Sequence, residues 1–359
     1  MVFIILRIWR NLLRMARVKP GRSAVAVSLL MVATLLANAL AFWWFDGQHN
    51  PAIGFGDALW YSLISVTTIG YGDFSATTWP ARMATIITIV FVGLPVFGAF
   101  MGILAERVVA HHEKEREGRL PVDDRGHVLI LNYPSAKRIQ DIASEFRADA
   151  QHRDRAIFLV TDSLATNPLS EEEIGFVRGS PIDEDVLRQA NVAEAATVIV
   201  LSPDYSSPES DSQVAAAITL VEGMQPAART VAECLDERHR FLFTSANTDA
   251  VIFPLRIANN AIVQVSQDPG VGKYLDRILA NTQAESLYST AVPEGAWQGV
   301  TYRDMARSLL DRQVVVQAIM QGEEVTMDLA GKAVRPGDRI IYYGRQRLTE
   351  QDLLAHVGR

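Results

Sequence analysis

Two long apolar runs stand out in the first third of the chain. The runs 24–45 and 83–105 contain no charged residue, and each is long enough to cross a hydrocarbon layer of about 30 Å as a helix. The segment 55–66 between them is apolar and aromatic but too short to cross. Irregular backbone at membrane depth survives only where protein surrounds it or where it lines a cavity. The pattern therefore predicts two spanning helices and one re-entrant helix over residues 24–110.

The rest of the chain alternates short apolar runs with amphipathic stretches. Residues 111–126 are highly charged and are predicted to form a helical extension or linker. Beyond them, strands are predicted at 127–131, 156–160, 176–177, 197–201 and 230–232. Helices are predicted at 135–146, 183–189, 211–222 and 237–246. This alternation is typical of an α/β doubly wound parallel sheet, a Rossmann-like fold, over residues 127–268.

Charge is distributed unevenly along the chain. The formal net charge is −7, but residues 1–23 carry six basic residues and no acidic one. The segment between the spans holds three aspartates and one arginine, and basic residues follow the second span. The positive-inside rule then places both termini in the cytoplasm and the intervening loop outside. The acidic remainder makes nucleic acid an improbable partner. The single cysteine, Cys234, fits a reducing cytoplasm and excludes an intrachain disulfide.

The first 23 residues have two interpretations. Arg7, Arg10, Arg14 and Arg17 recur at helical spacing on one stripe, which favours an amphipathic helix lying on membrane lipid at the inner leaflet. The alternative is a plain basic tail.

Residues 67–73 have the sequence TTIGYGD. Gly70 and Gly72 sit at alternate positions, where glycine reaches left-handed backbone conformations cheaply. Read between two spans and after an apolar re-entrant segment, this loop resembles the selectivity filter of potassium channels, in which backbone carbonyls replace the water around a K⁺ ion. An ordinary turn between strands is the alternative for the glycines taken alone.

The potassium-channel resemblance implies roles for particular residues. The filter would consist of Thr68, Ile69, Gly70, Tyr71 and Gly72. Residues supporting the filter would be Trp60, Tyr61, Thr67 and Asp73. Two spans and one filter make a quarter of a channel, so the resemblance implies a homotetramer in the inner (plasma) membrane of a bacterium or archaeon.

The second span carries helix-breaking residues. Pro95 removes a backbone donor and kinks a helix. Gly93 matches the gating hinge of related inner helices, and Gly98 and Gly102 follow it. We expect a bend that opens a gate near Gly102. The alternative is close helix packing by small residues, which is common in membranes.

The soluble half resembles the regulator-of-potassium-conductance (RCK, TrkA-N type) domain. The segment 179–183, GSPID, and the segment 190–192, ANV, are similar to characteristic parts of that family. Residues 269–285 would hold a connector helix at 271–280, and residues 286–359 a small α+β lobe. Residues 334–338, VRPGD, would form a hairpin turn there. The resemblance implies a ligand-gated channel.

Two classes of regulatory ligand are open. A nucleotide such as NAD, ADP or ATP would bind at the first strand–helix turn, where Asn132, Tyr133 and Ser135 replace the glycine-rich fingerprint. The next two candidates follow the second and third strands. These are Asp162, placed for ribose hydroxyls, and Arg178, placed for a phosphate; each could equally be a surface residue.

Calcium is the other candidate ligand. Calcium-gated relatives place two acids, one residue apart, after the fifth strand; here Glu233 fits the first position and Leu235 takes the second. Glu233 and Asp236 remain the candidate metal ligands, although acids at helix starts are more often solvated.

Three other functional classes compete with the ligand-gated K⁺ channel. A nonselective cation channel would share the architecture, but Tyr71 argues against it. A regulatory subunit of a potassium transporter would have no filter. An enzyme is not expected, because the sheet lacks both a glycine fingerprint and a placed His/Asp pair. The sequence leaves open which ligand acts and whether it opens or closes the pore.

Overall fold

The computed structural model describes residues 20–354 apart from 208, 225, 283, 284, 298 and 323. Residues 1–19 lie outside the described residues, so the amphipathic helix expected over 1–23 stays a prediction. Helix α2 already begins at Pro20. The chain divides into two compact units, with the boundary between Glu113 and Lys114.

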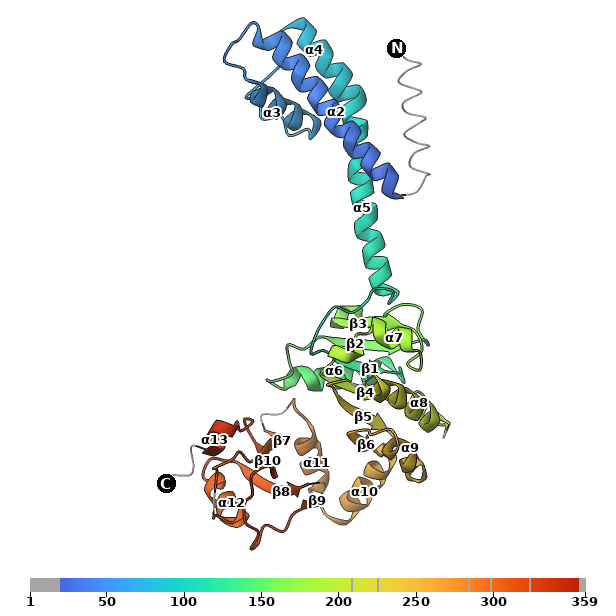
Figure 1. Ribbon diagram of the computed structural model, residues 1–359, viewed down its shortest axis with the longest axis vertical. Coiled ribbons are helices and arrows are strands. Elements are labelled where there is room, and N and C mark those ends of the chain that lie inside the picture. The colour runs from blue at the N-terminus through green and yellow to red at the C-terminus, as the bar shows by residue number, and fades with distance from the viewer. Residues whose placement is uncertain are drawn as a thin grey trace. The chain divides into compact units, whose positions relative to one another are not determined.

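The first unit is helical and contains both predicted spans. Its elements are α2 (Pro20–Gly47), α3 (Phe55–Val66), α4 (Trp79–Thr85), η1 (Ile86–Gly93) and α5 (Leu94–Arg116). The segments Ala24–Gly47 and Trp79–Arg116 are long and apolar enough to cross a membrane. The short α3 packs beside α2 (Figure 1), where the rings of Phe42 and Tyr61 stack 4.3 Å apart. η1 is a π-helical stretch in the second span.

The second unit opens with a six-stranded parallel sheet in the order β3-β2-β1-β4-β5-β6. Its strands are β1 (Val128–Leu131), β2 (Ile157–Thr161), β3 (Ile174–Arg178), β4 (Thr197–Val200), β5 (Arg229–Glu233) and β6 (Ala250–Ile252). Its helices are α6 (Ala136–Ala148), η2 (Ser170–Glu172), α7 (Glu184–Gln189), η3 (Val192–Glu194), α8 (Ser210–Gly223), η4 (Glu237–His239) and α9 (Arg240–Thr244). This strand order is that of the doubly wound dinucleotide-binding fold, so the predicted fold class is confirmed.

Both faces of the sheet are covered, which is why its strands are continuously apolar. In β1, Leu129 and Leu131 face the core under α7 and α8, whereas Val128 and Ile130 face Ile139 on α6. The carboxyl ends of β1 and β4 lie side by side where the strand order reverses. A crevice at that point is where doubly wound sheets bind ligands.

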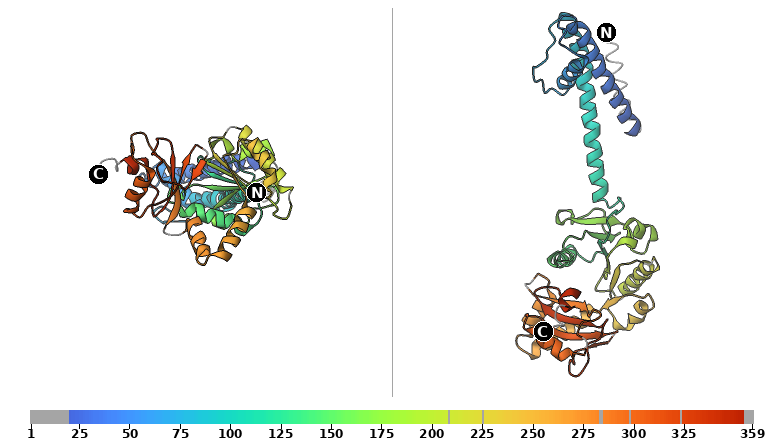
Figure 2. Two further views of the ribbon diagram at one scale, coloured as in Figure 1. Left: turned by 90° about the horizontal axis from the view of Figure 1, so that it is seen from below. Right: turned by 60° about the vertical axis from the view of Figure 1, so that its left-hand side comes forward.

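The remaining elements form a helix pair and a small lobe (Figures 1 and 2). They are α10 (Pro254–Gln267), α11 (Val271–Leu279), β7 (Ser286–Ala291), α12 (Tyr302–Leu310), β8 (Val315–Gln321), β9 (Glu324–Thr326), β10 (Arg339–Gly344) and α13 (Glu350–Leu354). The lobe's antiparallel sheet has the order β7-β10-β8-β9. β6 and α10 were not predicted. The expected hairpin over 334–338 is wrong: its turn leads into β10, but β10 pairs with β7 and β8 and not with β9.

The segment predicted as a linker is attached to the sheet. α5 continues to Arg116, and the chain then turns at Gly118, whose φ is +66°. The Gly118 carbonyl accepts a hydrogen bond from the Arg178 amide at 3.0 Å. A Cβ at Gly118 would lie 2.5 Å from that amide nitrogen. The Gln189 side chain also donates to the carbonyls of Gly118 and Leu120. The connection after α5 is therefore held against β3 and α7.

Candidate ion pore and regulatory cleft

The backbone of the filter loop alternates in handedness. φ is +61° at Thr68, +55° at Gly70 and +79° at Gly72. Glycine adopts such angles without steric cost, but a threonine there is strained by about 1–3 kcal/mol and persists only where its surroundings hold it. The alternation extends one step beyond the two glycines that the sequence singled out.

The carboxyl end of α3 holds this strained loop. The Thr68 amide donates to the Ser65 carbonyl at 3.2 Å, and the amides of Ile69 and Gly70 both donate to the Ile64 carbonyl, at 3.1 and 3.3 Å. The Thr67 hydroxyl donates to the Leu63 carbonyl at 2.9 Å. Carbonyls at a helix end lack helical partners, so the loop satisfies them. Within the described part of the chain, no hydrogen bond is donated to the carbonyl oxygens of residues 68–72.

The outer end of the loop is held by side chains. Trp60 Nε1 donates to Asp73 Oδ2 at 2.7 Å, and the rings of Trp60 and Tyr71 stack at 6.0 Å. Tyr61 lies elsewhere: it stacks on Phe42, and its hydroxyl is 3.4 Å from Thr85 Oγ1. Tyr61 therefore fastens α3 to the spanning helices, whereas Trp60 contacts the filter directly.

The glycines of the second span differ in their surroundings. A Cβ at the buried Gly93 would lie 3.0 Å from Val66 Cγ2 and 3.2 Å from the Thr88 carbonyl oxygen. At Gly98 and Gly102, no described atom beyond the adjacent helix backbone and chain neighbours lies within 4 Å of such a Cβ. Gly93 and Pro95 lie where η1 gives way to α5, and the Leu94 amide donates to the Ile89 carbonyl, five residues back. Gly93 thus allows close packing, and the expected bend stays a prediction at the end of a π-helical stretch.

In the second unit, an asparagine replaces glycine at the first strand–helix turn. Asn132 has φ +72°, a conformation that asparagine tolerates better than most side chains. Its Nδ2 donates to the Leu201 carbonyl at 2.8 Å, which ties the end of β1 to the residue after β4. The tight turn is therefore kept, but an amide side chain lies where the glycine fingerprint leaves space for a pyrophosphate.

A buried carboxylate meets a cation at this carboxyl end of the sheet. Glu233, at the end of β5, is 6% exposed and accepts a charge-assisted hydrogen bond from Arg138 on the first turn of α6. It also accepts from the Tyr205 hydroxyl at 2.8 Å and from the Ser202 amide at 2.9 Å. The Arg138 guanidinium lies 4.6 Å from the centre of the Tyr205 ring. Burial, with the Glu233 charge adding to it, raises the pKa of Tyr205 to about 12, so the phenol remains a donor.

The other candidate nucleotide residues are dispersed. Ser135 caps α6 by accepting from the Arg138 amide at 3.4 Å, and Tyr133 packs against the core under α6. Asp162 directly follows β2, Arg178 is the last residue of β3, and both are exposed. The Arg178 amide is used to hold Gly118. The structure thus places Asn132 where the strand order reverses and leaves Asp162 and Arg178 exposed to solvent.

The candidate metal ligands do not converge. Glu233 is committed to Arg138, whereas Asp236 pairs with Arg238 and caps η4. The hydrogen bonds from Arg238 lower the pKa of Asp236. Near them, the buried Asp211 accepts from His239 Nδ1 at 2.8 Å. Among the described residues, no group of three or more histidines, cysteines and acids is placed to hold a metal ion.

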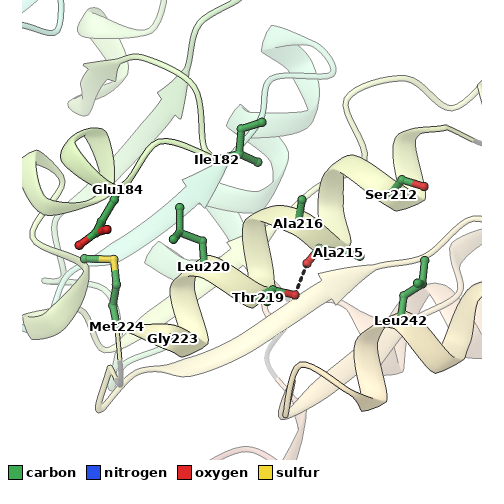
Figure 3. A pocket seen from close by; sticks show the side chains of 10 residues that line it. All are labelled: Ile182, Glu184, Ser212, Ala215, Ala216, Thr219, Leu220, Gly223, Met224 and Leu242. Atoms are coloured by element: carbon green, nitrogen blue, oxygen red, sulfur yellow. Dashed lines mark hydrogen bonds between the residues drawn. The ribbon is translucent and has the colours of Figure 1, made fainter.

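A second concave surface follows α8. This groove of about 740 Å³ is bordered by α8, by the start of α7 and by α9 (Figure 3). Its lining residues are Ile182, Glu184, Ser212, Ala215, Ala216, Thr219, Leu220, Gly223, Met224 and Leu242. Glu184 is the only charged residue among these, and it pairs with Arg188. None of the described residues that line the groove is a cation, so the groove suits apolar contacts better than an anionic ligand.

Arg138, Tyr205 and Ser202 were missed by sequence reasoning. One signal was present for Arg138. A cation in the first turn of a helix opposes the helix dipole, so its presence there indicates an acidic partner or an anionic ligand. Glu233 is separated from Arg138 by 95 positions, and the fold is needed to bring them together.

Comparison with known proteins agrees with this two-part architecture. Residues 29–110 match the family described as "Ion channel", and residues 140–254 match the TrkA-N domain family. The chain therefore combines an ion-channel domain with a TrkA-N domain. It is accordingly a membrane protein.

Individual relatives are distant. The calcium-gated potassium channel TvoK of Thermoplasma volcanium is 24% identical over 309 residues, which cover 84% of this chain and 85% of TvoK. YugO of Bacillus subtilis, whose name describes it provisionally as a potassium channel protein, is 24% identical over 272 residues, covering 74% and 80%. The solved GsuK channel bound to NAD is 18% identical with a TM-score of 0.46; the match covers 94% of this chain and 60% of the GsuK chain.

Proposed function

We propose that this protein is a potassium-selective channel whose pore is controlled by a ligand of the RCK domain. The filter loop carries the proposal: φ is positive at alternate residues from Thr68 to Gly72, and no described group donates to the carbonyl oxygens of residues 68–72. Alternating handedness lets successive carbonyls turn to the same side. A row of unpaired oxygens there is what a dehydrated K⁺ ion requires.

The working unit is a homotetramer. In the single chain, Ile69 is 57% exposed and Tyr71 is 67% exposed, although the loop lies between two spanning helices. Unpaired carbonyls in a bilayer each cost several kcal/mol, so the loop must be enclosed by other protein chains. Four copies around one axis would enclose it and form a closed symmetric assembly.

Selectivity depends on how firmly the loop is held. Tyr71, between the two glycines, stacks on Trp60, and Asp73, just after them, accepts a hydrogen bond from Trp60. This bracing favours a K⁺ filter over a nonselective cation pore. The test is the reversal potential of the purified channel in a planar bilayer between K⁺ and Na⁺ solutions. A reversal potential near zero would refute selectivity, and absence of current from the tetramer would refute the channel itself.

The orientation follows from charge. The basic segment before the first span and the basic residues after the second fit a cytoplasmic location for both termini and for the RCK domain. Protease protection in sealed vesicles tests this arrangement.

The ligand site that we propose is the crevice at Arg138. A cation at a helix N-terminus, where the sheet order reverses, suits an anionic ligand such as a nucleotide. In this structure the Arg138 guanidinium forms a salt bridge with Glu233, so an anionic ligand must displace the Glu233 carboxylate to bind. Calcium is less favoured, because Glu233 and Asp236 are each paired with an arginine.

The connection after α5 offers a route from crevice to pore. Residues 118–126 are hydrogen-bonded to β3, α7 and η3. Because no flexible linker separates these elements from the end of α5, a shift of β3, α7 or η3 moves that end directly. We infer that ligand binding alters the pull on the inner helices through this attachment.

A thermal-shift screen of the full-length channel in detergent tests the ligand class. NAD, ADP and ATP would be compared with Ca²⁺, since a ligand that binds only the folded state raises the melting temperature. A nucleotide shift that is lost in Arg138→Ala supports the crevice. Lys137→Ala is the matched control, because Lys137 is the preceding residue and pairs at the surface with Asp141. A shift with Ca²⁺ alone would refute the anionic ligand.

A further inference from the structure

Three polar side chains meet inside the membrane unit. Asn38 of α2 donates from Nδ2 to Ser62 Oγ of α3 at 2.8 Å, and Thr88 Oγ1 of η1 donates to Asn38 Oδ1 at 2.7 Å. Asn38 and Ser62 are fully buried. A buried amide in an apolar helix is costly unless its donor and acceptor are both satisfied. Asn38 satisfies them by bridging the re-entrant helix and the second span.

The two hydroxyl groups do not depend on Asn38. Ser62 Oγ also lies 2.8 Å from the Ala58 carbonyl, and Thr88 Oγ1 lies 2.7 Å from the Ala84 carbonyl. A hydroxyl carries one proton, so the Thr88 hydroxyl can donate to either Asn38 Oδ1 or the Ala84 carbonyl of its own helix, but not fully to both. Each hydroxyl therefore keeps a partner when Asn38 is removed. The contribution of Asn38 is the link between α3 and η1.

This link lies close to the filter and to the π-helical stretch of the second span. Ser62 is one turn before Val66, the last residue of α3, and the strained loop begins two residues later. Thr88 belongs to the π-helical stretch η1, whose last residue, Gly93, packs against Val66. The same two elements therefore meet twice, once through polar groups and once through close apolar contact.

We propose that Asn38 is a positioning residue that couples the π-helical stretch of the second span to the re-entrant helix, so that movement of the inner helix reaches the selectivity filter. The inference rests on the proposed channel function. Asn38 touches no ion; it acts through Ser62 and Thr88. Without it, α3 and η1 keep their apolar contact at Val66 but lose their polar connection.

The test uses single-channel recordings of the full-length channel in planar bilayers with symmetric K⁺. Asn38→Leu keeps a side chain of similar size and removes both polar contacts, and Ser62→Ala and Thr88→Val each remove one partner. Thr34→Val is the matched control. Thr34 is also buried on α2, one turn before Asn38, and its hydroxyl donates to the Leu30 carbonyl of its own helix at 2.7 Å.

We expect Asn38→Leu to shorten the mean open time about threefold, which corresponds to about 0.6 kcal/mol, an average interhelical hydrogen bond in a membrane protein. The double variant with Thr88→Val should show no larger change, because the link is already broken. Thr34→Val should match the wild type. The K⁺ over Na⁺ reversal potential should be unchanged and the variant should still assemble as a tetramer, which separates coupling from a loss of fold.

Two results would overturn the inference. One is an Asn38→Leu channel with the open times of Thr34→Val. The other is a double variant whose effects multiply, because independent contributions mean that Asn38 does not connect the two helices. If Asn38→Leu does not assemble, Ser62→Ala and Thr88→Val provide the same test in milder form. A wild-type tetramer without K⁺ current would instead refute the proposed function.

Discussion

Replacing Gly93 by alanine separates two explanations of this position. If Gly93 is a hinge, alanine stiffens the helix and alters opening; if it is a packing site, alanine crowds its neighbours. The new Cβ would lie 3.0 Å from Val66 Cγ2 and 3.2 Å from the Thr88 carbonyl oxygen. Such crowding costs about 1–3 kcal/mol, against a gain of roughly 0.5–1 kcal/mol from replacing a helical glycine. We expect Gly93→Ala to lower the stability of the pore unit by about 1 kcal/mol.

Tryptophan fluorescence during thermal unfolding measures this effect, because Trp297 is the only tryptophan outside the first 113 residues. Adding Val66→Ala removes the nearer methyl group, so the double variant should be more stable than the sum of the single effects predicts. Gly98→Ala is the control, since its Cβ meets no described atom within 4 Å beyond the adjacent helix backbone and chain neighbours. Additive effects, or a stable Gly93→Ala channel with altered opening, would refute the packing explanation.

Three further predictions concern other sites. Trp60→Phe removes the hydrogen bond to Asp73 and should increase brief closures while K⁺ selectivity persists, as seen in single-channel records; unchanged closures would contradict this bracing. Burial, followed by nearby acidic charge, raises the pKa of Cys234 to about 12, so iodoacetamide should label it at pH 8 only after denaturation, which mass spectrometry detects. Burial alone would raise the pKa of Asp149, but hydrogen bonds, including one from Arg347, lower it overall. The ionised Asp149 therefore stabilises the folded state above the pKa of an unfolded aspartate, and this stabilisation is lost as the pH falls through the lowered pKa of the folded state. Arg347→Met should therefore lose less stability on acidification than the wild type does, as measured by melting temperature between pH 6 and pH 3.

The elements that sequence predicted best are those that repeat a local pattern. Uninterrupted apolar runs identified both spans, and continuous apolar strands identified β1 and β2, because burial on all sides leaves a signal in neighbouring residues. α10 escaped because none of its residues is buried in the single chain. The apolar side chains of α10 are not covered by the rest of this chain.

Contacts between distant positions left no such signal. Asn38 and Thr88 are 50 positions apart, and Arg138 and Glu233 are 95 apart. The positive φ of Asn132 was hidden for a different reason: the dinucleotide-binding fingerprint specifies glycine at this turn, whereas asparagine also reaches that conformation. The glycine pattern did locate the filter, but the strain at Thr68 depends on the bonds that α3 supplies.

The unpaired carbonyls of residues 68–72 also bear on how the protein is made. A newly inserted chain carries them into the bilayer without a described donor, so in the proposed tetramer the loop reaches its lowest free energy only when four chains and the ions come together. Potassium is then a component required for maturation as well as the transported species. A cell depleted of it would accumulate immature subunits that quality-control proteases can recognise.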